Sequence, residues 1–450
     1  MTTVMDSPIC EFVSRYAASD PLRLHMPGHK GTSHLGMESM DITEIDGADS
    51  LFEAQGIIQK SEENASKIFG CPTFYSTEGS SLCIRAMLYL CILYAKQAGK
   101  QPLIAAARNV HSTFIRAAAM LDFDIHWLYG DQNNGYLSCT IDPEQLEDWL
   151  KNEASRPVAV YLTSPDYLGN IADIRRFSQI CHRYGVLLIV DNAHGAYLKF
   201  LSNSEHPMDL GADLCCDSAH KTLPVLTGGA YLHISNHAPQ LFTNLAKQAL
   251  AMFASTSPSY LILQSLDAVN NYLSVTYPQL LNAFLPSCDQ IKTELTAHGY
   301  TFIGNEPLKL TIDCKGYGYT GVELSQLLKA SNIHAEFSDP DYLVLMLTPE
   351  IGMEGLQKLK VALTAIPQQQ AITNSAPTPT KGKQIMSPRQ AAFSLCNTIP
   401  VTESLGRVLA SPSVGCPPAV PIIVCGEQID QNAIDCFTYY GIETCCVTEP

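Results

Sequence analysis

A lysine and an acid follow two apolar runs in the middle of the chain, and together they could hold a cofactor. The run at 186–190 ends in Asp191, and a later apolar stretch leads into Ser218-Ala-His-Lys221. A lysine amine forms a Schiff base with an aldehyde, and a carboxylate keeps a pyridine nitrogen protonated so that the ring accepts electrons. Alone, Lys221 could be a surface lysine and Asp191 a helix cap. At the ends of strand-like runs, they predict a site for pyridoxal 5'-phosphate (PLP) in which both are catalytic.

Two histidines could complete the site around the ring. His194 lies three residues beyond Asp191 and could contact the ring or its phenolic oxygen, although a structural histidine is a serious alternative. His111 follows the apolar run at 103–107, and an imidazole there could stack on the face of the ring. It could equally be a polar loop residue, so the residues alone leave both interpretations of His111 open.

A turn with one glycine and two serines opens the helix expected at 80–97 and could bind the phosphate. Backbone N–H groups at a helix start, with hydroxyls beside them, surround an anion well. Such turns are also common as plain helix caps, so this motif alone is a weak signal. Ser218 and His220, which lie shortly before Lys221, could complete the phosphate site. The expected phosphate-binding residues are Gly79, Ser80, Ser81, Ser218 and His220.

Short apolar runs alternate with helical stretches through most of the chain. The expected strands lie at 103–107, 124–128, 158–162, 186–190 and 229–234. The helices between them are expected at 80–97, 113–121 and 174–184. Runs that are apolar on both faces predict a mainly parallel, doubly wound α/β sheet. Because ligands bind beyond the carboxyl ends of such strands, the candidate residues are expected along one rim.

Changes in composition divide the chain into five parts. These are a polar N-terminal segment (1–50), a PLP-binding large domain (51–300), a smaller α+β domain (301–366), a Gln-, Pro- and Thr-rich linker (367–388) and a C-terminal module (389–450). With 450 residues the chain can bury a large core.

The composition restricts the partners. The formal net charge is −16, which argues against binding to nucleic acid or to anionic membrane surfaces because both require clustered Lys and Arg. It is compatible with a cationic small substrate, although an acidic soluble enzyme is the plainer interpretation. We expect no secretory leader, because the first residues lack basic and apolar regions, and no apolar run of the ~18 residues that span a membrane.

Cysteine usage points to the compartment. Sixteen cysteines are scattered through the chain without a Cys-x-x-Cys pair of zinc-binding spacing. We therefore expect no metal, mostly buried free thiols and a reducing cytoplasm.

Eight motifs together carry a resemblance to a known family. In chain order they are LHMPGHKG (24–31), DITEID (41–46), GSS (79–81), RNVH (108–111), TSP (163–165), DNAHGA (191–196), SAHKT (218–222) and STSP (255–258). With them the chain resembles the Orn/Lys/Arg decarboxylases, which are PLP enzymes of the aspartate-aminotransferase fold (fold type I). The stretch at 417–427 resembles the C-terminal domain of that family.

The resemblance implies a role for each candidate. Lys221 would be the Schiff-base lysine, Asp191 the partner of the ring nitrogen and His111 the residue that stacks on the ring. In a homodimer, Thr256 and Ser257 would reach the phosphate of the other subunit, although a plain helix cap is the alternative. The chain departs from the family pattern at Asn192, where an acid is frequent, and at Glu78, where a small polar residue is more usual.

The activity implied is decarboxylation of arginine, lysine or ornithine to an amine and CO2, as in amino acid metabolism and polyamine biosynthesis. Two alternatives remain. One is another PLP-dependent reaction, by an aminotransferase or a different lyase. The other is a non-catalytic PLP-fold protein with a binding or regulatory role, against which the presence of Lys221 and Asp191 argues. Arginine, lysine and ornithine differ at the far end of the side chain, and no motif in the sequence indicates which of them is the substrate.

Overall fold

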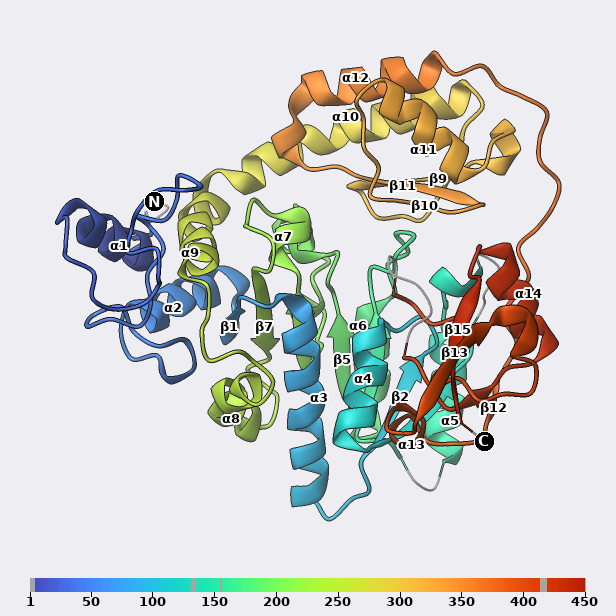
Figure 1. Cartoon of the computed structure of the whole chain (residues 1–450), viewed down its shortest axis with the longest axis horizontal. Coiled ribbons are helices and arrows are strands. Elements are labelled where there is room, and N and C mark those ends of the chain that lie inside the picture. The colour runs from blue at the N-terminus through green and yellow to red at the C-terminus, as the bar shows by residue number, and fades with distance from the viewer. Residues whose placement is uncertain (1–4, 131–134, 154–155, 413–418, 450) are drawn as a thin grey trace. The chain divides into compact units, whose positions relative to one another are not determined.

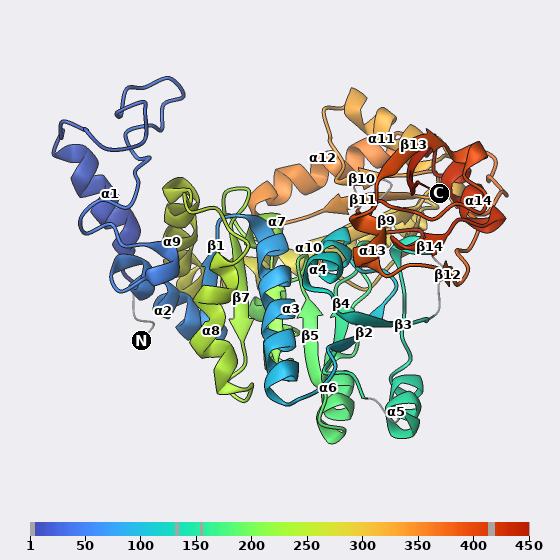
Figure 2. The ribbon, with the colours of Figure 1, turned by 60° about the horizontal axis from the view of Figure 1, so that its bottom comes forward.

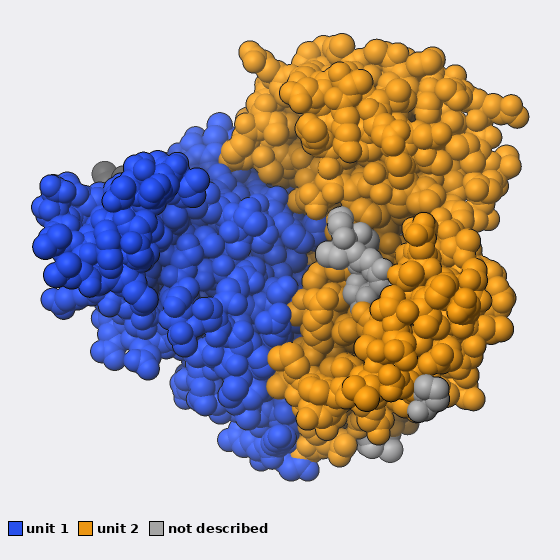
Figure 3. Space-filling model, in the orientation of Figure 1, with its two compact units in different colours: residues 1–99, 187–282 blue, residues 100–186, 283–450 orange. Residues whose placement is uncertain are grey.

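The computed structural model describes residues 5–130, 135–153, 156–412 and 419–449 (Figure 1). The chain divides into two compact units, each assembled from two separate stretches of sequence (Figure 3). Unit 1 contains residues 1–99 and 187–282, and unit 2 contains residues 100–186 and 283–450. The five parts expected from composition, with their boundaries, stay predictions.

The central sheet has seven strands in the order β1-β7-β6-β5-β4-β2-β3. Those of unit 1 are β1 (Thr73–Ser76), β5 (Leu187–Asp191), β6 (Leu214–Asp217) and β7 (Ala230–Ile234). Those of unit 2 are β2 (Leu103–Ala107), β3 (Asp124–Leu128) and β4 (Ala159–Thr163). Strand β5 is parallel to β6, and β2 is parallel to β3 and β4, whereas β7 is antiparallel to β1 and β6. The sheet is therefore mainly parallel, as the sequence predicts, and the expected strands at 103–107 and 124–128 coincide with β2 and β3.

Helices surround the strands of unit 1. They are α1 (Pro8–Ala18), α2 (Ile57–Phe69), α3 (Gly79–Gln97), α7 (Ala219–Thr222), α8 (Gln240–Ala251) and α9 (Tyr260–Val275). Helix α3 packs against β6, β7 and α8, and α2, α3 and α8 all contact β1 (Figure 2).

Helix α3 corrects one expectation from the sequence. In the part of the chain that the structure describes, it is the single helix long and apolar enough to cross a membrane by length and composition. Its apolar side chains have another use, because 61% of its most apolar window is buried inside the protein. Positions such as Leu82, Leu88 and Leu90 face neighbouring elements of the core.

Unit 2 adds a second, smaller sheet. Its order is β10-β11-β9-β8, and every neighbouring pair is antiparallel. The strands are β8 (Thr301–Ile303), β9 (Lys309–Asp313), β10 (Phe337–Ser338) and β11 (Tyr342–Met346). The helices of this unit are α4 (Ser112–Leu121), α5 (Pro143–Asn152), α6 (Ile174–Arg183), α11 (Gly321–Ala330), α12 (Gly352–Thr364), α13 (Pro388–Ala392) and α14 (Gln431–Tyr439), and α10 (Tyr277–Ala297) begins in unit 1 and ends in unit 2.

The C-terminal residues form two short strand pairs and join the core of unit 2. Strand β12 (Lys383–Gln384) pairs with β14 (Glu427–Gln428), and β13 (Cys396–Pro400) pairs with β15 (Thr444–Thr448). Their apolar side chains share one buried cluster with residues from earlier in unit 2, among them Tyr136, Leu168 and Phe337. In the stretch at 417–427 that resembles the family's C-terminal domain, residues 417 and 418 lie outside the described residues.

Candidate functional site

Lys221 and Asp191 lie at the carboxyl ends of two adjacent parallel strands. Asp191 is the last residue of β5 and pairs in register with Cys216 of β6. Strand β6 ends at Asp217, and Lys221 follows it on the four-residue helix α7. Because parallel strands bring their carboxyl ends to one edge, the sheet places both residues at the same rim of unit 1.

His194 contacts the lysine directly. The Nζ atom of Lys221 lies 3.0 Å from Nε2 of His194, and the His194 side chain is buried. A neutral imidazole nitrogen can accept the proton of a lysine ammonium at this distance. His194 therefore stands where it can accept a proton from Lys221. The predicted contact of His194 with the cofactor ring stays a prediction.

Asp191 is held deep in the sheet. Its side chain is 2% exposed, and its Oδ1 atom accepts hydrogen bonds from the backbone N–H of Ala193 (3.2 Å) and the thiol of Cys216 (3.6 Å). A carboxylate shielded from water interacts strongly with a cation placed beside it. The position and burial of Asp191 suit a partner for a protonated ring nitrogen.

Serines from two elements meet at the start of α3. The hydroxyls of Ser80 and Ser218 are 2.8 Å apart and hydrogen-bonded. Gly79 adopts a φ of +71°, which favours glycine, and donates its N–H to the carbonyl of Gly228 at 2.7 Å. Gly79 therefore shapes the turn, while the N–H groups of the next residues, Ser80 and Ser81, stand at the helix start where anions bind.

His220 packs beside this turn. Its Nδ1 atom lies 2.9 Å from the carbonyl oxygen of Gly229, so Nδ1 carries a proton and donates it. A methyl group added to Gly79 would lie 4.0 Å from the His220 ring. The fold thus brings together Ser80, Ser218 and His220, three of the five residues expected to bind phosphate, around the Gly79 turn.

The carboxylate of Glu78 bonds to the backbone of another segment. Its Oε1 atom accepts the N–H of Ser255 at 2.7 Å. The next two residues, Thr256 and Ser257, are exposed. The cap of α9 is Ser259, whose hydroxyl accepts the N–H of Ile262, so Ser257 is not the helix cap that was its alternative role. The role of Thr256 and Ser257 in a partner subunit stays a prediction.

His111 belongs to unit 2, where it caps helix α4. Its Nδ1 atom accepts the N–H of Thr113 at 3.2 Å and lies 2.9 Å from the hydroxyl of Thr113. This bonding fixes the ring just beyond the end of β2. The predicted stacking of His111 on a cofactor ring stays a prediction.

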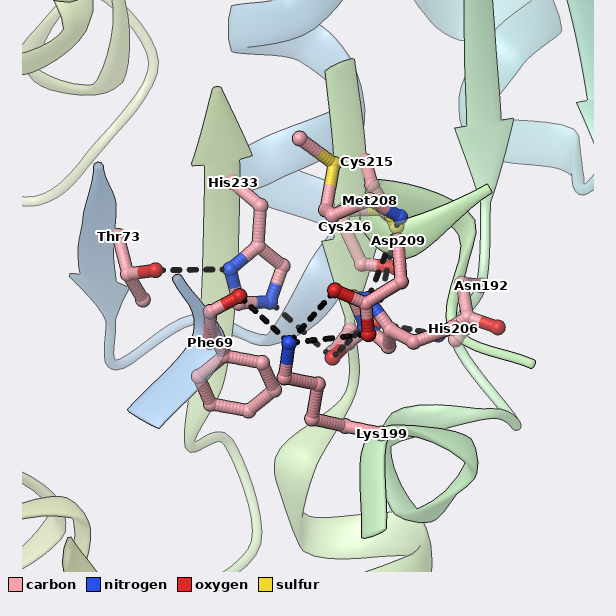
Figure 4. A network of polar contacts seen from close by, with 12 residues as sticks. Phe69, Thr73, Asn192, Lys199, His206, Met208, Asp209, Cys215, Cys216 and His233 are labelled. Atoms are coloured by element: carbon pink, nitrogen blue, oxygen red, sulfur yellow. Dashed lines mark hydrogen bonds and ion pairs between the residues drawn. The ribbon is translucent and has the colours of Figure 1, made fainter. Parts of the chain in front are cut away.

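One group of functional interest is absent from the sequence expectations. Asp217, the residue before Ser218, is fully buried and accepts hydrogen bonds from His206, His233 and Asn192. Figure 4 shows these three partners in a network of polar contacts. The sequence shows that positions 206 and 233 are histidines. That both bond to Asp217 depends on the tertiary fold, so the sequence alone did not reveal this group.

Comparisons with known proteins place these features in a family. The sequence profile of the major domain of Orn/Lys/Arg decarboxylases matches residues 7–305. An arginine decarboxylase of Bacillus subtilis is 28% identical over 463 residues, covering 95% of this chain and 92% of the relative. An arginine decarboxylase of Halalkalibacterium halodurans is 26% identical, covering 96% of this chain and 93% of the relative.

Solved structures agree in fold. The lysine decarboxylase of Francisella novicida superposes with a TM-score of 0.80 at 16% identity, covering 100% of this chain and 82% of the other. The constitutive lysine decarboxylase of E. coli superposes with a TM-score of 0.75 at 17% identity, covering 99% of this chain and 82% of the other. At these identities the likeness shows a shared fold.

Proposed function

The chain belongs to the Orn/Lys/Arg decarboxylase family, and we propose that it binds PLP and removes the α-carboxylate of a basic amino acid, giving an amine and CO2. The observation that carries this proposal is the contact between Lys221 and His194 at the rim where Asp191 ends its strand. This contact gives the lysine a proton acceptor, at the same rim of unit 1 as the deeply buried carboxylate of Asp191.

The residues present fit the cofactor. Lys221 would hold its aldehyde carbon and Asp191 its ring nitrogen, with His111 stacked on the ring. The hydroxyls of Ser80 and Ser218, which already meet at a helix start, suit a phosphate. When bound, the cofactor supplies an electron-poor ring that takes up the electron pair left behind by CO2.

The remaining chemistry belongs to the side chains of the chain. A lysine must lose its proton before its amine can attack a carbonyl, and Nε2 of His194 lies where it can accept that proton from Nζ of Lys221. Burial of Asp191 keeps water from competing for its carboxylate, which strengthens its bond to a cationic nitrogen.

The substrate class follows from charge and relatives. The net charge of −16 is compatible with a cationic substrate, and the curated relatives reported above are named arginine decarboxylases. We propose arginine, lysine or ornithine as the substrate, with a role in polyamine biosynthesis. The cysteines among the described residues form no disulfide with one another and most are buried, which supports a reducing cytoplasm as the compartment.

A direct assay tests the proposal. Purified protein is incubated with PLP and with arginine, lysine or ornithine, and CO2 and the matching amine are measured. We expect equal amounts of both from one of the three. A 2-oxo acid in place of CO2 would indicate an aminotransferase, and bound PLP without turnover of any amino acid would indicate a non-catalytic protein.

A further inference from the structure

Asp217 lies at the centre of a buried polar cluster behind the proposed cofactor site. Its side chain is inaccessible to solvent, as are those of His206 and His233. The Oδ2 atom of Asp217 accepts from Nε2 of His206 (3.0 Å) and from Nε2 of His233 (3.1 Å), and Oδ1 accepts from Nδ2 of Asn192 (2.7 Å). Burying a carboxylate is costly unless such partners compensate for lost water, and here both oxygens are satisfied.

His233 is held through both of its ring nitrogens. Its Nε2 atom donates to Asp217, and its Nδ1 atom lies 2.9 Å from the hydroxyl of Thr73. The same hydroxyl also lies 3.0 Å from the carbonyl oxygen of Cys71. These contacts fix the imidazole ring against the Asp217 carboxylate.

His206 plays a different part in the same cluster. Its Nδ1 atom accepts the N–H of Met208 at 3.4 Å, and its Nε2 atom faces Asp217 at 3.0 Å. The two histidines thus present their Nε2 atoms to one oxygen of the Asp217 carboxylate. Burial alone would raise the pKa of Asp217, but the charges and hydrogen bonds of the two histidines outweigh it and hold that pKa below its ordinary value. Burial likewise lowers the pKa of His233, and Asp217 reverses the shift and raises it.

The cluster is attached to both catalytic segments. Asn192 directly follows Asp191, and it is bound to β6 twice, by its side chain to Asp217 and by its backbone N–H to the carbonyl of Cys216 (3.0 Å). On the other side, Asp217 is followed at once by Ser218, whose hydroxyl bonds to Ser80, and then by the turn that carries Lys221.

We propose that Asp217 is a positioning residue, whose bond to Asn192 fixes the end of β5 with Asp191 relative to the turn with Lys221. This inference rests on the proposed function, because it assigns a role toward PLP. It also explains why the chain has an amide at position 192, where the family often has an acid. A carboxylate there would meet the Asp217 carboxylate across a distance of 2.7 Å.

A bound metal is the competing interpretation of the same three side chains. His206, Asp217 and His233 offer ligand atoms that lie within 4.8 Å of one another. A metal ion, however, would need unprotonated Nε2 atoms, and both Nε2 atoms stand at hydrogen-bond distance from one carboxylate oxygen. The hydrogen-bonded cluster therefore accounts for the geometry without an ion.

The test uses exchange of the two partners. Asn192→Asp should weaken PLP binding by about 10- to 100-fold, the effect of losing a charge-assisted bond, because it sets two carboxylates against each other. Asp217→Asn should weaken it less, because a flipped Asn192 amide can still pair with an amide at 217. The double variant Asn192→Asp/Asp217→Asn re-forms the bond with its direction reversed. We expect it to regain most of the PLP affinity that Asn192→Asp loses.

The readouts separate positioning from simple stability. PLP affinity is measured by titrating apoprotein and following the visible absorption, and thermal unfolding is measured on the same apoprotein. The matched control is Asn270→Asp, at an equally buried asparagine of unit 1 that bonds Tyr75 and Ser61. It should lower the melting temperature and leave the PLP affinity of folded protein unchanged.

Four outcomes would overturn the inference. Asn192→Asp with unchanged PLP affinity, or a double variant no better than Asn192→Asp, would show that the two residues are not coupled. Stoichiometric metal in purified protein would identify the cluster as a metal site. Wild-type protein that binds no PLP would overturn the proposed function and this inference together, whereas wild-type binding with unaffected variants overturns only the inference.

Discussion

Arg108 and Glu427, which stand 319 residues apart in sequence, form a buried ion pair in unit 2. The Nη2 atom of Arg108 lies 3.1 Å from Oε2 of Glu427, and the two side chains are 4% and 2% exposed. The same glutamate oxygen accepts the N–H of Val424, and the guanidinium lies over the ring of Trp127. Arg108 directly follows β2 and precedes His111 by three residues, so a residue of the C-terminal part holds the segment that carries His111.

We expect Glu427→Ala to lower the free energy of unfolding by about 3–5 kcal/mol, because removing one partner leaves the Arg108 charge buried without compensation. Glu427→Gln should lower it less, since an amide oxygen can still accept from Arg108 and Val424. Urea unfolding measures both. Glu294→Gln, at a surface glutamate paired with Lys360, is the control and should change little. An unchanged stability in Glu427→Ala would show that the pair is not needed for folding.

The contact between Lys221 and His194 predicts separate effects of the two residues. Lys221→Ala should abolish both the visible band of bound PLP and turnover, because no amine remains to hold the aldehyde. His194→Ala should retain the cofactor while turnover falls by about 100-fold or more, the usual contribution of a placed proton acceptor. Absorbance and product formation are measured together, with the exposed Lys329→Ala as control. A fully active Lys221→Ala protein would refute the assignment.

Asp191→Asn should keep PLP but lose most of its turnover. An amide cannot hold a ring nitrogen protonated. The loss of the charge-assisted bond between Asp191 and the ring nitrogen should cost about 1.5–3 kcal/mol of interaction energy. The side chains are nearly equal in size, so the buried strand end should keep its shape. Steady-state kinetics and the stoichiometry of bound PLP provide the measurement. Turnover at the wild-type rate would mean that Asp191 has a structural role only.

Thr256 and Ser257 are predicted to act in the partner subunit of a homodimer. Both are exposed on a segment whose backbone Glu78 fixes through Ser255, and one two-fold interface would complete both sites. A Lys221→Ala chain and a Thr256→Ala/Ser257→Ala chain should each be impaired alone. Mixed and allowed to exchange subunits, they should regain one intact site per mixed dimer. No recovery after proven exchange, or full activity in a monomer, would exclude the shared site.

The sequence predicted the fold where the signal is local. Strand β2 has the expected bounds because it is a short apolar run, and β3 has them because polar and apolar residues alternate from Asp124 to Trp127. The turn that carries Lys221 was predicted after a strand because the motif directly follows an apolar run. These features depend on a few consecutive residues, which is the range over which hydrophobic periodicity acts.

The parts that escaped prediction depend on residues distant in sequence. The cluster around Asp217 joins four segments of unit 1, and no one of them shows that His206 and His233 converge on one oxygen. The N–H of Gly79 was expected to face an anion, yet it bonds to Gly228 because the fold brings another loop against the helix start. Side-chain pairing of this kind follows from packing, which the pattern of a single sequence does not specify.

A buried acid of unit 2 predicts how stability varies with pH. Asp339 is 7% exposed, and burial raises its pKa from 3.8 to about 6, with the nearby charge of Asp341 adding to the shift. Its Oδ1 atom accepts the N–H groups of Asp341 and Tyr342, which an asparagine oxygen can also do. Between pH ~4 and ~6 the folded state keeps a proton that the unfolded state has released. Asp339 therefore lowers stability progressively as pH rises through that window, and the loss is complete above it.

Asp339→Asn removes this titration and should be more stable than wild type at pH 7, by up to about 3 kcal/mol for a shift of roughly two pKa units. The advantage should shrink as the pH falls toward 4, because both states of the wild type are then protonated. Urea unfolding of the two proteins at several pH values gives the difference curve, and its acid end serves as the internal control. A difference that grows toward acid pH would have the wrong sign and would mean that Asp339 is stabilised as a carboxylate in the folded protein.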